Sequence, residues 1–144
     1  VLDVPASVSK IGTWGIDGGY KIYAAGGSKV KSYVSKYGRD SMGGMSYVAR
    51  PKDPAGIKCK RLKDNKVQIN WKRPSGASGY VVYMSTKKSS IGKRVKVIKG
   101  GKSTSYSSGK LKKGKTYYYY METYRTVKGH KIYSTYVNGV KIKL

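Results

Sequence analysis

The chain of 144 residues has very few side chains that could catalyse a reaction or hold a metal ion. It contains one histidine, one cysteine and six carboxylates, against 31 lysine and arginine residues. General acid–base catalysis needs paired carboxylates or a poised histidine, and a metal site needs several converging ligands. His130 lies at an expected hairpin tip, and Cys59 is expected to be a small buried residue of a strand. The sequence therefore predicts a protein that is not an enzyme and that needs no metal or other cofactor.

Other absences narrow the class of protein. A single cysteine excludes an intramolecular disulfide, which fits a cytosolic protein as well as a secreted protein of a Gram-positive bacterium. No apolar run approaches the roughly 20 residues that span a bilayer. The first residue is Val1 rather than methionine, as expected of a processed protein or of a fragment. Phenylalanine is absent, whereas tyrosine occurs 15 times and glycine 19 times, a composition typical of a β-rich, loop-rich chain.

The positive charge is distributed unevenly along the chain. Residues 1–55 have a net charge of +4, and residues 56–144 have +21 of the total of +25. Such a surface attracts polyanions, which include nucleic acid, teichoic acids, acidic polysaccharides and anionic lipid headgroups. Only six of the basic residues are arginine. Because base-edge readout relies on the bidentate geometry of arginine, sequence-specific DNA binding is disfavoured. A lysine-coated surface without a specific ligand is the competing interpretation.

From about residue 54 onward, short alternating segments are separated by turns. Residues 66–72 alternate strictly, with Val67, Ile69 and Trp71 on one face. Further strands are expected at 57–62, 80–84, 94–98, from Tyr106 toward 111, 117–123, 132–136 and 140–144. About seven strands at a spacing of roughly 8–14 residues predict an all-β sandwich. The expected core consists of Ile57, Val67, Ile69, Trp71, Tyr80, Val82, Leu111, Tyr117, Tyr119, Val140 and Ile142.

Several motifs in this region resemble the fibronectin type III family. Residues 111–117 (Leu-Lys-Lys-Gly-Lys-Thr-Tyr) are similar to the family's Leu-x-x-Gly-x-x-Tyr corner, and residues 76–83 (Gly-Ala-Ser-Gly-Tyr-Val-Val-Tyr) are similar to the start of its third strand. Trp71 stands where the family keeps a core tryptophan. Residues 115–119, followed by 126–129, resemble the Lys- and Tyr-rich variant of clostridial and related Gram-positive surface proteins.

The resemblance implies a fold and a class of function. It implies a seven-stranded, immunoglobulin-like β-sandwich over residues 54–144, in which Tyr117 closes a corner by hydrogen-bonding back to the backbone. Trp71 and Leu111 are expected to be structural residues beside it. It also implies a domain that builds, spaces or adheres rather than one that catalyses.

Residues 1–53 are interpreted as a small Gly-rich N-terminal segment. Val30, Tyr33, Val34 and Tyr37 have helical spacing, which favours one short helix there, and the remainder reads as short strands and glycine turns. About 50 residues can barely bury a core alone. The segment is therefore expected either to form an accessory subdomain or to act as an arm that lends a strand to a neighbouring subunit, which would be a route to a filament.

Two groups of side chains are candidates for binding. Tyr83, Tyr118, Tyr120 and Tyr124 are expected on one solvent-facing side of two neighbouring strands. Aromatic rings flanked by lysine can stack on sugars or bases or form a protein interface. Cross-strand tyrosine pairing that only stiffens the sheet is the plainer interpretation. The candidate polyanion-binding residues are six lysines of the basic part of the chain: Lys110, Lys112, Lys113, Lys115, Lys128 and Lys131.

These observations favour a non-enzymatic structural or adhesive module of an extracellular bacterial surface assembly, such as a filament subunit, with a basic surface suited to anionic polymers. The alternatives are a phage virion component, either a head decoration or a tail-associated domain, and a free polyanion-binding protein. The expected partners are other protein subunits, and anionic wall polymers, polysaccharide or nucleic acid bound without sequence specificity. The expected location is the extracellular space or cell surface, with the virion as the alternative.

Overall fold

The computed structural model describes residues 2–3, 21–24, 32, 46–134 and 139–144. The chain divides into two compact units, Val1–Arg50 and Pro51–Leu144. In the first unit, three strands form a parallel sheet in the order β1-β2-β3, from β1 (Leu2–Asp3), β2 (Lys21–Ala24) and β3 (Ser46–Ala49). Of the expected helix around 30–37, the structure describes only Ser32, which is helical; the rest lies outside the described residues.

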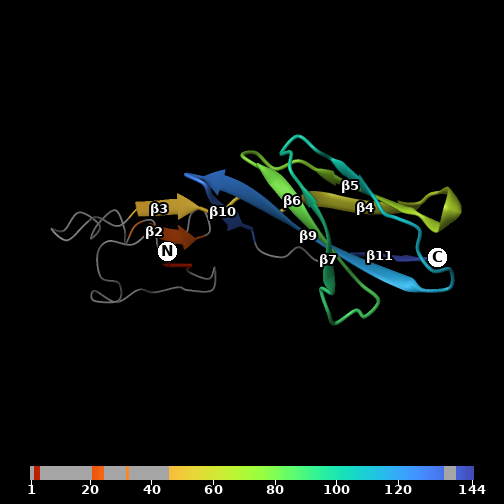
Figure 1. Ribbon diagram of the computed structural model, residues 1–144. Helices are drawn as coiled ribbons and strands as arrows, with labels where there is room; N and C mark the ends of the chain where they lie inside the picture. The colour runs from red at the N-terminus through yellow and green to blue at the C-terminus, as the bar shows by residue number, and fades with distance from the viewer. Residues whose placement is uncertain (1, 4–20, 25–31, 33–45, 135–138) are drawn as a thin grey trace. The chain divides into compact units, whose positions relative to one another are not determined.

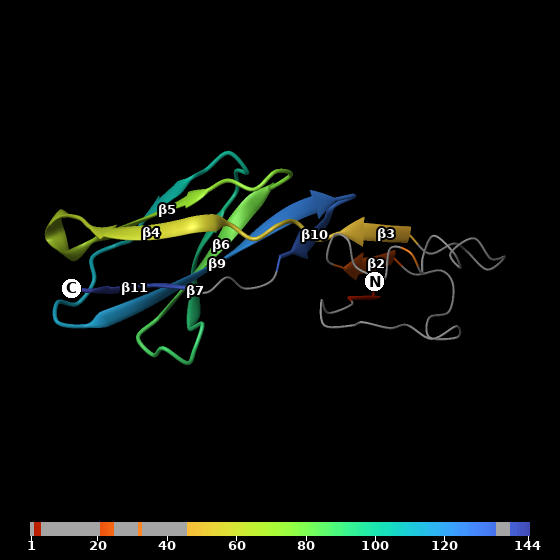
Figure 2. The same cartoon turned by 180° about the vertical axis from the view of Figure 1, so that it is seen from behind.

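The second unit is a sandwich of two antiparallel sheets (Figures 1 and 2). The first sheet has the order β4-β5-β8, from β4 (Ala55–Arg61), β5 (Val67–Lys72) and β8 (Ser105–Ser107), with a short 3-10 turn η1 (Lys63–Asn65) between β4 and β5. The second has the order β10-β9-β6-β7, from β6 (Gly79–Ser85), β7 (Lys93–Ile98), β9 (Thr116–Val127) and β10 (His130–Tyr133). The last strand, β11 (Val140–Lys143), also pairs with β9.

Seven strand positions result, because β10 and β11 occupy the same side of β9. Tyr119 pairs with Met84 of β6 on one side and with Val140 of β11 on the other, whereas Tyr124 lies between β6 and β10. The all-β sandwich expected from the sequence is therefore confirmed. The expected strand at 132–136 is observed at His130–Tyr133, and residues 135–136 lie outside the described residues.

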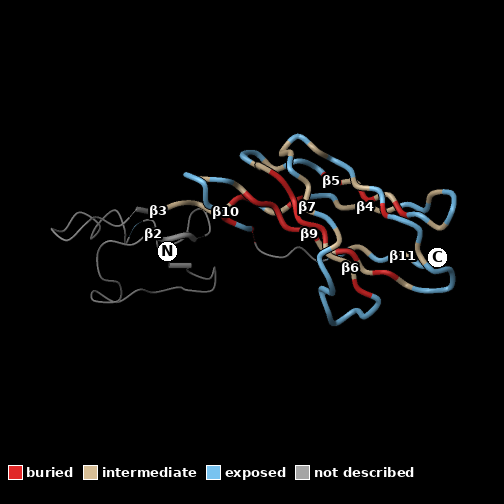
Figure 3. The backbone as a smooth tube through the Cα atoms, viewed as in Figure 1, coloured by how far each residue is buried: buried red, intermediate tan, exposed pale blue. Residues whose placement is uncertain are grey.

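The core follows from the alternation of side chains along β5, β6 and β9, where buried segments concentrate (Figure 3). Successive residues of a strand point to opposite faces, so each strand contributes every second side chain. The Trp71 and Tyr80 rings pack edge to face, with centroids 5.1 Å apart. The buried core cluster consists of Val67, Ile69, Trp71, Tyr80, Val82, Tyr117, Tyr119 and Met121. Four other expected core residues pack against it and are partly buried: Ile57, Leu111, Val140 and Ile142.

A corner fixes the chain where it enters β9. The Lys112 amide donates a hydrogen bond to the Tyr117 hydroxyl at 2.9 Å, and this hydroxyl lies 3.3 Å from the Lys112 carbonyl, which accepts from it. The Leu111 amide donates to the Asn65 carbonyl at 3.0 Å, which ties the corner to the turn before β5. Gly114 lies between these contacts with φ of +80°, a conformation that glycine adopts without strain. The corner therefore sets which residues of β9 face the core.

Candidate functional site

The outer face of the second sheet carries the candidate tyrosines. Because Tyr117, Tyr119 and Met121 point into the core, the alternate residues of β9 point outward. The pairing of β9 with β6 places Tyr120 opposite Tyr83. The other two tyrosines of β9 lie opposite Ser85 (Tyr118) and Gly79 (Tyr124). The structure thus places all four candidate tyrosines on one side of the sheet.

Two of these rings cover glycines of neighbouring segments, Gly79 of β6 and Gly139 just before β11. A Cβ atom added to Gly139 would lie 2.8 Å from the Tyr120 ring, and one added to Gly79 would collide with the Tyr124 ring. The Tyr120 hydroxyl donates to the Lys88 carbonyl at 2.9 Å, and the Tyr124 hydroxyl donates to the Ile98 carbonyl at 3.3 Å. An aromatic ring over a cross-strand glycine is a packing device of sheets. Tyr120 and Tyr124 therefore hold the sheet together.

Lys131 and Tyr133 complete the surroundings of Tyr124. The Lys131 ammonium lies 4.8 Å from the centroid of the Tyr124 ring, within the range of a cation–π contact. The Tyr133 ring is 6.1 Å away and tilted by 55°. Although its position on the strand is an outward one, Tyr124 is only 4 % exposed. Lys131, a candidate polyanion ligand, is thus engaged with this ring.

A buried carboxyl lies between Tyr120 and Tyr124 on the outward side of β9. Glu122 is only 5 % exposed, and the Tyr83 hydroxyl donates to its Oε1 atom at 2.7 Å. Burial raises the pKa of Glu122; the hydrogen bond from Tyr83 opposes this rise, and the negative charge of Asp53 adds to it. The sequence pattern places Glu122 on the outward side, but it gives no sign that this part of the face is covered.

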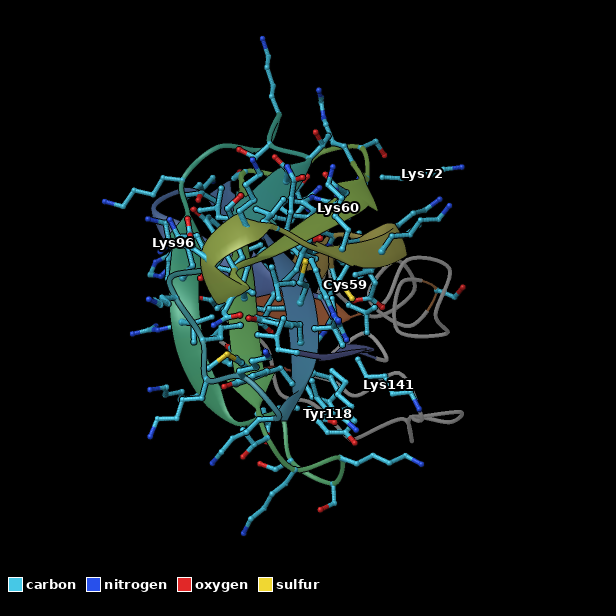
Figure 4. All side chains as sticks on the ribbon, turned by 90° about the vertical axis from the view of Figure 1, so that its right-hand side faces the viewer. Cys59, Lys60, Lys72, Lys96, Tyr118 and Lys141 are labelled. Atoms are coloured by element: carbon cyan, nitrogen blue, oxygen red, sulfur yellow. The ribbon has the colours of Figure 1, made fainter. Side chains whose placement is uncertain are left out.

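Tyr118 differs from the other three tyrosines. It is half-buried, and no hydrogen bond within the described residues involves its hydroxyl. Its cross-strand neighbours are Lys141 on β11 and Ser85 on β6, and Figure 4 shows it on the same side of the sandwich as Lys141. A shallow depression of about 420 Å³ adjoins this point, because Ser85 also lines it together with Met84, Thr86, Lys87, Gly92 and Lys93. Tyr118 is therefore the one of the four tyrosines whose hydroxyl has no hydrogen bond within the described residues and whose ring adjoins a depression.

The six candidate lysines form two groups rather than one. Lys110, Lys112, Lys113 and Lys115 surround the corner before β9, whereas Lys128 and Lys131 lie beyond its other end. All six are exposed. A strand of the length of β9 spans about 40 Å, so the structure does not bring the two groups together.

The remaining reactive side chains offer little chemistry. The Cys59 thiol donates to the Lys141 carbonyl at 3.4 Å, and burial raises its pKa, which disfavours the reactive thiolate. His130 is exposed at the start of β10, after a turn in which Lys128 and Gly129 have positive φ. Within the ranges that the structure describes, no three His, Cys, Asp or Glu residues converge on a possible metal position. None of the described helical segments is long and apolar enough to cross a membrane.

Comparison with known proteins identifies relatives of the second unit. Residues 52–139 match the family model of the fibronectin type III domain. A Fn3-like protein from Clostridium thermocellum has a similar solved structure, with 23 % identity, a TM-score of 0.50, and coverage of 61 % of this chain and 90 % of that one. The structure of FN3tt mut is 16 % identical, with a TM-score of 0.53, and the match covers 66 % of this chain and 97 % of that one. The chicken CNTN1 FN1-FN3 domains are 14 % identical, with a TM-score of 0.54, and the match covers 68 % of this chain and 34 % of that one. No curated protein matches the sequence.

The buried carboxyl generates a prediction about pH. Because the raised pKa of Glu122 lies above the ordinary value near 4.5, the folded protein keeps this proton at pH values where the unfolded chain has lost it. The contribution of Glu122 to stability therefore falls as the pH rises from about 4.5 through the raised pKa. We expect Glu122→Gln to be at least as stable as the native chain at pH 7.5, with the difference shrinking toward pH 4.5, as measured by urea unfolding at both pH values.

Tyr83→Phe is the companion variant. It removes the hydroxyl that favours the ionised carboxyl, so it should steepen the loss of stability between pH 4.5 and pH 7.5. If Glu122→Gln were less stable than the native chain by more than about 1 kcal/mol at pH 7.5, the ionised carboxyl would stabilise the fold and the dominance of burial would be contradicted.

Proposed function

This chain belongs to the fibronectin type III family, and from that premise we propose that it is a structural or adhesive module of an extracellular bacterial surface assembly that holds anionic polymers. Domains of this family are generally non-catalytic structural or binding modules, which supports the first part of the proposal. The second part is supported by the charge of the sandwich. The bacterial setting is supported by the Lys- and Tyr-rich segments around residues 115–119, which resemble those of Gram-positive surface proteins.

The observation that carries the proposal is the uncompensated positive charge. Residues 56–144 have a net charge of +21, and the carboxylates of the sandwich unit are only Asp53, Asp64 and Glu122. One of the three, Glu122, is buried and accepts a hydrogen bond from the Tyr83 hydroxyl. A small domain needs a net charge of only about 2–8 to remain soluble. The excess costs stability through self-repulsion, and a polyanionic partner would offset that cost.

Adhesion through charge has a measurable signature. Each lysine that pairs with a phosphate releases condensed counterions, so the logarithm of affinity falls linearly with the logarithm of salt concentration. We expect the full chain to bind fluorescently labelled poly(glycerol phosphate) at 50 mM NaCl and to lose at least about a hundredfold in affinity by 300 mM, as measured by anisotropy. Dextran, an uncharged polymer, is the control and should not bind. Absence of binding to any anionic polymer at 50 mM NaCl would contradict the proposal.

Assembly with other subunits is assigned to Tyr118. This ring is half-buried, it has Lys141 as its cross-strand neighbour, and it adjoins the depression at Ser85. Tyrosine is enriched at protein interfaces because it supplies a large ring with little loss of side-chain freedom. The packing roles of Tyr120 and Tyr124 make Tyr118 the tyrosine of this face whose replacement leaves the sheet intact.

Substitution of Tyr118 separates assembly from folding. Copies of the chain should associate at 300 mM NaCl, where their repulsion is screened. Tyr118→Ser should abolish this association with a change in unfolding free energy below about 0.5 kcal/mol, whereas Tyr118→Phe, which keeps the ring, should retain it. Sedimentation velocity measures the association, and urea unfolding measures the stability. A native chain that stays monomeric at every salt concentration would overturn self-assembly as part of the proposal.

A further inference from the structure

The outer face of the first sheet has a different chemistry from that of the second. Val67, Ile69 and Trp71 point into the core, so their neighbours on β5 point outward. The pairing places Lys58, Asn70 and Ser105 in one row across the three strands, and Lys60, Gln68 and Ser107 in the next. With Lys72, these residues make up the face. None of its outward positions, all within the described residues, is aromatic or acidic.

A bulge in β4 aligns Lys72 with the other two lysines. Between Ala55 and Lys58 the register shifts, and Gly56 adopts φ of +60°. The Cγ, Cδ and Cε atoms of Lys72 lie 3.4, 3.6 and 3.7 Å from the position that a Cβ atom of residue 56 would occupy. The Lys72 stem therefore lies in van der Waals contact with the position where a side chain of residue 56 would begin, although Lys72 belongs to β5.

Three lysine stems consequently lie along β4: Lys58 and Lys60 belong to it, and the stem of Lys72 passes beside Gly56. Lys58, Lys60 and Lys72 are all exposed. Figure 4 shows Lys60 and Lys72 on one side of the sandwich, away from Tyr118 and Lys141 on the other side. The result is a row of three cations, two of them two residues apart on β4 and the third beside Gly56, two residues before Lys58. No outward position of this face carries a carboxylate to neutralise them.

The interval of this row points to a class of ligand. Two residues of a strand contain six backbone bonds and span about 6.7 Å. A polymer in which a three-carbon polyol links successive phosphates also has six backbone bonds from one phosphorus atom to the next. In an extended chain its charges therefore recur at nearly the interval of the lysines. Each phosphate carries a single negative charge, which suits the compact ammonium of lysine.

The neighbours of the row favour a polyol over a nucleobase. Single-stranded nucleic acid has the same six-bond repeat, but its binding sites add aromatic rings on which the bases stack. This face has no such ring. Instead, the amides of Gln68 and Asn70 and the hydroxyls of Ser105 and Ser107 can exchange hydrogen bonds with the hydroxyls of a polyol.

We propose that the outer face of β4, β5 and β8 binds a linear polyol-phosphate polymer along β4, with Lys58, Lys60 and Lys72 paired to successive phosphates. The inference rests on the proposed function, because it names the face and the ligand through which adhesion occurs. Lysines on an edge strand such as β4 also discourage pairing with other chains. That role does not account for Lys72, which projects from the central strand β5 and reaches β4 only over Gly56.

A charge-matched pair of triple variants tests the inference on the full chain. The first variant is Lys58→Gln/Lys60→Gln/Lys72→Gln. The second, Lys88→Gln/Lys96→Gln/Lys99→Gln, removes the same charge from exposed positions in and beside β7. Anisotropy with labelled poly(glycerol phosphate) at 50 mM NaCl should show about a tenfold loss of affinity for the first variant. Its salt slope should shrink by about two. The second variant should lose less than about threefold in affinity. Urea midpoints that are equal in the two variants will show that both fold.

A third variant, Lys110→Gln/Lys112→Gln/Lys113→Gln, compares this face with the corner before β9. Equal losses in all three variants, or a larger loss at the corner, would overturn the inference and leave charge-driven adhesion standing. Failure of the native chain to bind the polymer would instead overturn the proposed function. Tighter binding of a single-stranded oligonucleotide with the same number of phosphates, lost equally in the first variant, would show a nucleic-acid site and contradict the polyol assignment.

Discussion

The packing of β9 against the rest of the sandwich is the interaction on which the other features depend. Its 12 residues pair with β6 on one side and with β10 and β11 on the other. Tyr119 and Met121 are fully buried on its inner side, and burial raises the pKa of Tyr119 to about 12. The apolar area removed from water there offsets the repulsion among more than twenty cations. The same strand presents Tyr118 on its outer side.

The outer faces of the two sheets carry different kinds of side chain. Tyrosine rings line the outer face of the second sheet, where Tyr120 and Tyr124 pack over glycines, and Tyr118 is the ring that we propose contacts a partner. The outer face of the first sheet combines lysine, amide and hydroxyl groups. A module that assembles through one face and holds an anionic polymer on the other would use both. Neither task requires a reactive group, which agrees with the scarcity of histidine and carboxylate in the chain.

Sequence alternation predicted the sandwich and the direction of most side chains, because a strand exposes every second residue to the same face. The family was indicated separately, by the resemblance of motifs such as residues 111–117. Alternation could not predict what reaches across from a neighbouring strand. Three such contacts place a side chain against a glycine of a neighbouring segment, and each depends on the register of two strands. They are Tyr120 with Gly139, Tyr124 with Gly79, and the Lys72 stem with Gly56. The burial of Glu122 has the same origin. The candidate lysines form two groups because β9, which runs from the corner at 111–117 to the turn at 128–129, lies between them.

We infer that the positive charge of the sandwich binds a polyanionic partner and lowers the stability of the fold through self-repulsion. The most direct test is the free energy of urea unfolding of the full chain at 20 mM and at 500 mM NaCl, and at 20 mM NaCl with poly(glycerol phosphate) present. We expect the free energy of unfolding to rise with salt, because salt screens the repulsion. We expect it to rise also with the polymer at low ionic strength, because a ligand of the folded state stabilises it. Stability that falls with salt and ignores the polymer would contradict the claim.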